Sequence, residues 1–69
     1  MEFERLYTEY ESAIETQKNV IQAYLKKLKN ARRKANLNEV SRLNGILTVL
    51  YTEKSELEQL ASQLKLYIS

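Results

Sequence analysis

The chain has 69 residues, so it forms at most one small domain with little capacity to bury a core. It contains no cysteine, histidine or proline and a single glycine, which excludes disulfides and thiolate or imidazole metal sites and favours long helices over sheets. The net charge is +2, and no apolar run approaches the ~20 residues of a membrane span. We therefore expect a soluble cytoplasmic protein without cofactor, metal site or membrane partner.

The first predicted element is a helix over about residues 2–34. Apolar side chains recur at two positions of a seven-residue repeat, a and d, and Gln17 is the interruption. The first turn carries Glu2 and Glu4, and residues 32–34 are all basic. This distribution of charge complements the helix dipole at both ends, so the repeat and the charges indicate the same helix.

A turn is predicted at about residues 35–37, because the heptad phase breaks there. Ala35 and Val40 both occupy position a, yet they lie five residues apart instead of seven. A straight helix would point its two apolar stripes in different directions. A break therefore fits best, and a continuous helix in an intermolecular coiled coil remains the alternative.

Residues 36–39 have the pattern of a capping box at the start of a second helix. In such a box the Asn36 side chain accepts a hydrogen bond from the Glu39 amide, and the Glu39 side chain accepts one from the Asn36 amide. No glycine is present for the left-handed residue that commonly ends a helix. We expect Asn36 or Asn38 to adopt that conformation instead.

The second predicted helix covers about residues 38–68 and continues the heptad, interrupted at Lys54. Folding it back on the first helix produces layers in which the two residue numbers add to 71. These layers are Phe3/Ile68, Tyr7/Leu64, Tyr10/Ala61, Ile14/Leu57, Gln17/Lys54, Ile21/Leu50, Tyr24/Leu47, Leu28/Leu43 and Ala31/Val40. The predicted fold class is all-α, with residues 1–69 forming one antiparallel, coiled-coil-like helical hairpin.

The polar layer formed by Gln17 and Lys54 has two interpretations. Lys54 can extend to solvent beside Gln17, or the pair can fix the register of the helices by penalising slipped alignments.

One flank of the seam, at heptad position g, is more apolar than a two-helix hairpin needs. We predict that it is the interface of a homodimeric four-helix bundle, and a groove for another protein's amphipathic helix is the alternative. The predicted interface residues are Leu6, Ala13, Val20, Ile46, Leu60 and Tyr67.

Charge is separated along the predicted rod. Residues 18–51, the half with the turn, hold eight basic and one acidic residue, a net charge of +7; the remaining residues carry −5. Two rods that pack head to tail set each basic turn beside an acidic end, so charge favours an antiparallel dimer.

The basic segment 26–34 has a second interpretation as a nucleic-acid site, and the candidate residues are Lys26, Lys29, Arg32 and Arg33. It lacks interleaved aromatic residues for base stacking. No converging titratable groups suggest catalysis. We therefore expect a small non-enzymatic interaction protein, an adaptor, co-chaperone or regulator, with a nucleic-acid-binding regulator as the alternative.

Overall fold

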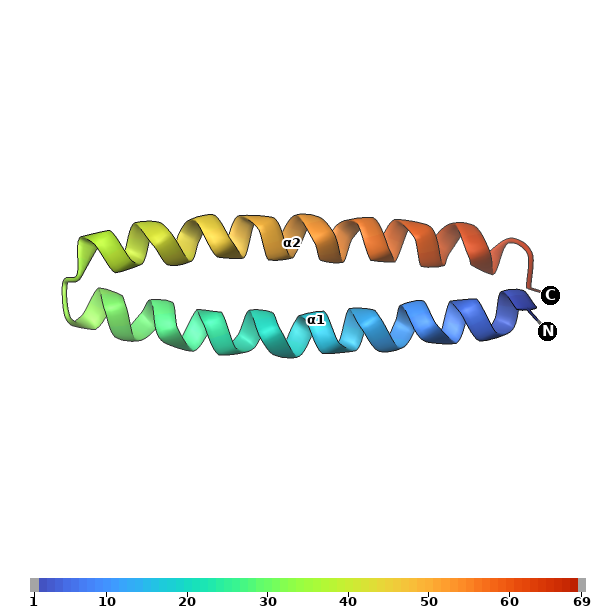
Figure 1. Cartoon of the computed structure of the whole chain (residues 1–69), viewed down its shortest axis with the longest axis horizontal. Helices are drawn as coiled ribbons and strands as arrows, with labels where there is room; N and C mark the ends of the chain where they lie inside the picture. The colour runs from blue at the N-terminus through green and yellow to red at the C-terminus, as the bar shows by residue number, and fades with distance from the viewer. Residues whose placement is uncertain (1, 69) are drawn as a thin grey trace.

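The computed structural model describes residues 2–68 as two antiparallel helices, α1 (Glu2–Arg33) and α2 (Leu37–Lys65) (Figure 1). The hairpin is a rod with Cα extents of 51 × 15 × 12 Å, and the first turn of α1 lies beside the end of α2, opposite the turn. The predicted all-α hairpin is confirmed, and the continuous helix is wrong. Within the described residues, neither helix has a stretch long and apolar enough to cross a membrane.

The seam between the helices is formed by the residues of the predicted layers. All six fully buried residues belong to these layers, and every other member except Phe3 is half-buried. The seven-residue repeat keeps one stripe of each helix facing the other, which removes these side chains from water. The fully buried residues are Ile21, Leu28, Ala31, Leu43, Leu47 and Ala61.

Burial is unequal along the rod. The main core cluster, which includes Ile21, Leu28 and Leu43, lies in the half next to the turn. In the half next to the chain ends, Ala61 is the one fully buried residue among those described. The open half therefore keeps more of its apolar surface in contact with solvent than the turn half does.

The turn is a Schellman motif that ends α1. The Asn36 amide donates to the Ala31 carbonyl at 3.0 Å and the Ala35 amide donates to the Arg32 carbonyl at 3.0 Å. The left-handed residue is Ala35, with φ of 54°, so the expectation that Asn36 or Asn38 adopts this conformation is wrong. In this motif the left-handed residue precedes the one that closes the outer bond, and Asn36 is that next residue.

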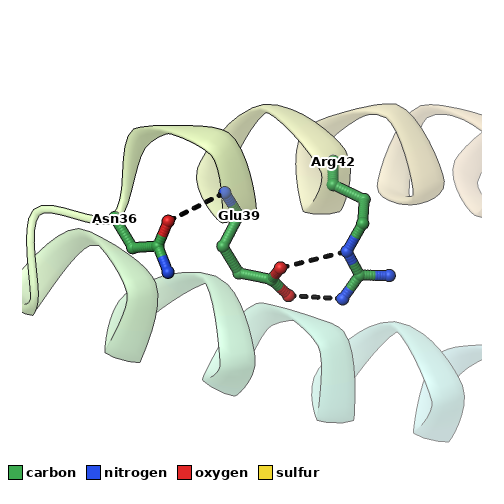
Figure 2. Close-up of polar contacts among 3 residues, drawn as sticks. All are labelled: Asn36, Glu39 and Arg42. Atoms are coloured by element: carbon green, nitrogen blue, oxygen red, sulfur yellow. Dashed lines mark hydrogen bonds and ion pairs between the residues drawn. The ribbon is translucent and has the colours of Figure 1, made fainter.

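The predicted capping box forms only in part (Figure 2). The Asn36 Oδ1 accepts a hydrogen bond from the Glu39 amide at 3.2 Å, as expected. The reciprocal bond is replaced, because the Asn36 amide donates to Ala31 and the Glu39 carboxylate instead pairs with the Arg42 guanidinium. This pairing with Arg42 lowers the pKa of the Glu39 carboxyl group.

The second helix ends at Lys65, before the predicted limit of about 68. The Leu66 amide donates to the Gln63 carbonyl at 3.2 Å, and the Tyr67 amide donates to the Leu64 carbonyl at 2.9 Å. Bonds of this shorter spacing tighten the last turn and satisfy carbonyls that the helix leaves without partners.

Candidate interaction surfaces

The six residues predicted for the interface lie along one flank of the rod, which we call the g side. Leu60 is 43% exposed and Tyr67 is 70% exposed. The other four residues are half-buried against the hairpin's own seam. The hairpin thus covers this flank in part and leaves its outer surface in water.

Two further apolar residues extend the g side. Val49 is 58% exposed and lies three residues after Ile46, which places it on the same face of α2. Phe3, predicted to pack against Ile68 in the seam, is 49% exposed, and its ring stacks on Tyr67 with centroids 5.4 Å apart. Helical spacing from Ile46 and Leu60 is the signal that identifies Val49.

The opposite flank, at heptad position e, is mainly charged. A groove of about 310 Å³ lies along it, lined by residues that include Glu11, Lys18 and Glu58. The Glu11 carboxylate, four residues along α1, is the main cause of a raised pKa for the Tyr7 phenol. Within residues 2–68, no group of three or more potential metal ligands lies close enough together to hold an ion.

Gln17 and Lys54 are predicted to form one layer, but each forms its hydrogen bonds with other residues. The Gln17 Nε2 donates across the seam to the Leu50 carbonyl at 3.2 Å and to the Glu53 carboxylate at 3.3 Å. The Lys54 Nζ extends along α2 to the Glu58 carboxylate at 3.1 Å, and the Lys54 side chain is 21% exposed. Gln17 therefore ties α1 to one main-chain atom of α2, while Lys54 reaches toward solvent.

The basic segment 26–34 lies at the turn end of α1. Its cations are all exposed, and none forms an ion pair with another residue of the described part of the chain. The Lys27 Nζ lies over the Tyr24 ring, 4.8 Å from its centroid. The cations are Lys26, Lys27, Lys29, Arg32, Arg33 and Lys34.

Heptad position divides these cations between two directions. Lys27 and Lys34 occupy position g and lie toward the g side. Lys26 and Arg33 at position f, together with Lys29 at b and Arg32 at e, lie away from it. The structure thus separates the four candidate polyanion-binding residues from the apolar flank.

No protein-family model, curated protein or solved structure matches this chain. The role of these surfaces must therefore be inferred from their geometry and chemistry.

Proposed function

We propose that this protein is a non-enzymatic interaction module that acts as an antiparallel homodimer, with the g sides of two hairpins packed into a four-helix bundle. The observation that carries the proposal is the apolar flank that one hairpin leaves uncovered. Along it Phe3, Val49, Leu60 and Tyr67 are between 43% and 70% exposed. Large apolar side chains that several turns of helix expose along one flank are typical of an interaction site.

The area of the molecule supports association. The hairpin exposes 5429 Å², whereas a compact monomer of 8.1 kDa exposes about 4,500 Å². One face of a rod with extents of 51 × 15 Å offers roughly 750 Å² per protomer, about the size that stable protein interfaces bury on each partner. A second copy of this chain therefore provides a partner of suitable size.

Charge complementarity selects the antiparallel arrangement. When two rods overlap along their full length in opposite directions, residues of the two α1 helices whose numbers add to about 36 lie side by side at 1.5 Å per residue. Glu9 then faces Lys27 of the second copy, and Ala13 faces Ala23 near the centre. Glu2 and Lys34 form the corresponding outer pair. A parallel pair would instead place like charges together.

The α2 helices complete the same interface. The overlap sets Ile46 of one hairpin near Leu60 of the other, which pairs two apolar side chains. It also brings the two copies of Glu53 together near the two-fold axis, an unfavourable contact. Each Glu53 carboxylate already accepts a hydrogen bond from Gln17 at 3.3 Å, which offsets part of that repulsion.

The test compares two substitutions on opposite flanks of α2. Val49 is 58% exposed and lies on the g side, whereas Tyr51 is 49% exposed and lies on the opposite flank. In sedimentation equilibrium at micromolar concentration, we expect the wild type and Tyr51→Glu to be dimers. Val49→Glu should be a monomer, because it buries an unpaired charge in the interface.

Circular dichroism checks that each variant remains helical, and Leu60→Glu provides a second disruption of the g side. A folded wild-type monomer at these concentrations would refute the homodimer and favour the groove for another protein's helix. If the dimer survives Val49→Glu and Leu60→Glu but not Tyr51→Glu, the interface lies on the flank at position e, and the proposed g-side interface is wrong.

A further inference from the structure

We infer that the dimer carries a binding face for double-stranded DNA, built by the two α1 helices, in which Lys26, Lys29, Arg32 and Arg33 of each copy contact phosphates. This inference rests on the proposed homodimer and adds a ligand to it.

The fold does not require this density of cations. Near the end of α1, the carbonyls of Asn30, Ala31 and Arg32 already accept main-chain hydrogen bonds. The cations are therefore not needed to cap these groups. Favourable interaction with the helix dipole accounts for basic residues in the last turn, but it falls off within that turn and does not extend to Lys26.

The cations also repel one another. Lys29 lies three residues from Lys26 and from Arg32, and four residues from Arg33, so each of these like charges is its neighbour on the helix surface. With no ion pair to any described residue, the repulsion is unrelieved within one hairpin. A polyanionic ligand is the kind of partner that relieves it.

The dimer leaves four of the six cations of segment 26–34 free. Lys27 and Lys34 lie toward the g side, where the dimer sets them against acidic residues of the second copy. The other four lie at positions b, e and f, away from that interface. They stay accessible when the two hairpins associate.

The symmetry of the dimer brings the cations of the two copies together. An interface that uses the g side of both copies has its two-fold axis in the interface plane, perpendicular to the rods. This axis sets α1 beside the second α1, so Lys26, Lys29 and Arg33 of both copies share one face, and Arg32 at position e lies at an outer edge of that face in each copy. The centres of the two sets of cations, near residue 30 of each copy, are separated along the rods by about 36 Å at 1.5 Å per residue.

That separation matches the ligand. One turn of B-form DNA measures about 34–36 Å, so two patches at this spacing meet equivalent phosphates on one side of a duplex. The segment has no exposed aromatic residue for stacking single-stranded bases, since Tyr24 is half-buried in the seam. The patch therefore favours the phosphate backbone of a duplex, without sequence preference.

The experiment measures binding to a 20-base-pair and an 8-base-pair DNA duplex by fluorescence anisotropy, as a function of salt. Eight phosphate contacts predict a loss of affinity of about 10⁴-fold for the 20-base-pair duplex between 50 and 200 mM salt. The monomeric Val49→Glu variant presents four cations, so its affinity should fall only about 10²-fold. The short duplex spans roughly 27 Å at 3.4 Å per base pair and cannot reach both patches, so the wild type should bind it at least tenfold more weakly.

Lys29→Glu is the variant that tests the patch itself. It should lower affinity for the long duplex at least tenfold, and it should raise the midpoint of thermal unfolding because it converts three repulsive pairs into attractive ones. Lys65→Glu makes the same change in charge at an exposed residue of α2, on the side of the dimer away from the two α1 helices, and should leave affinity within about threefold of the wild type.

The outcomes separate this inference from the proposed function. A wild-type dimer that does not bind duplex DNA at 50 mM salt refutes the DNA-binding face and leaves the dimer standing. A wild-type monomer that binds with the weaker salt dependence refutes the dimer and the paired patches together. Equal affinity for the two duplex lengths, or tighter binding to a duplex of RNA than to one of DNA, would show that the two patches do not bind together across one turn of B-form DNA.

Discussion

Replacing Ala35 by glycine should stabilise the hairpin. Ala35 is exposed and has φ of 54°, a conformation that costs an L-residue roughly 1–2 kcal/mol. Glycine adopts it without that penalty but gives the unfolded chain more freedom, which costs about 0.4–1 kcal/mol. The net gain is therefore about 0.5–1 kcal/mol, by subtraction of two central values.

In a domain of this size such a gain raises the midpoint of thermal unfolding by roughly 2–8 °C. Circular dichroism at one fixed protein concentration measures it, since dimerisation would make the midpoint concentration-dependent. Substitutions at the same position give an internal control. Because the side chain is exposed, backbone conformation should set the order of stability, with glycine highest, then asparagine, alanine and valine. Valine equal to alanine, together with glycine below it, would refute the left-handed assignment.

Three further predictions concern the helices. Gly45→Ala should stabilise α2 by about 1 kcal/mol in thermal melts, because a Cβ at this helical position meets no atom within 4 Å; an unchanged midpoint would contradict it. Gln17→Leu combined with Lys54→Leu should raise stability by roughly 1–3 kcal/mol and, if the polar layer fixes register, produce several assembly states in native mass spectrometry; a single unchanged assembly argues against register control. Arg42 lowers the pKa of Glu39 from 4.5, so its contribution is full above the unfolded-state pKa and is lost as pH falls through the lower folded-state value. Between pH 7 and 3 the wild type should thus lose more stability than Glu39→Gln, and parallel pH profiles for the two would contradict this.

The heptad repeat was sufficient to predict the hairpin and the residues buried between its helices, because a period of seven residues defines which face of each helix is buried. It could not predict the conformation of Ala35. That residue is placed by the hydrogen bond of its own amide to the Arg32 carbonyl, by that of the Asn36 amide to the Ala31 carbonyl, and by the use of Asn36 as the cap of the next helix. Several residues of the turn could adopt the left-handed conformation, and residue type alone favours asparagine over alanine for it.

The candidate surface was predictable in outline but not in extent. Position g identified Leu60 and Tyr67 but did not include Val49 at position c, which the three-residue spacing from Ile46 places beside that position on the helix surface. Phe3 is 49% exposed and its ring stacks on Tyr67, which lies beyond the end of α2 at Lys65. Ends of helices respond to local hydrogen bonding, which a periodic pattern does not describe.

The concentration of the core near the turn implies a gradient of local unfolding along the rod. Amide hydrogens around Leu28 and Leu43 should exchange with solvent slowly, whereas those of the open half, with fewer buried contacts, should exchange through frequent local opening. In an antiparallel dimer the easily opened half of each hairpin lies against the tightly packed half of its partner. Association would then even out protection from exchange, and residues near Leu60 would become more protected as the protein concentration rises.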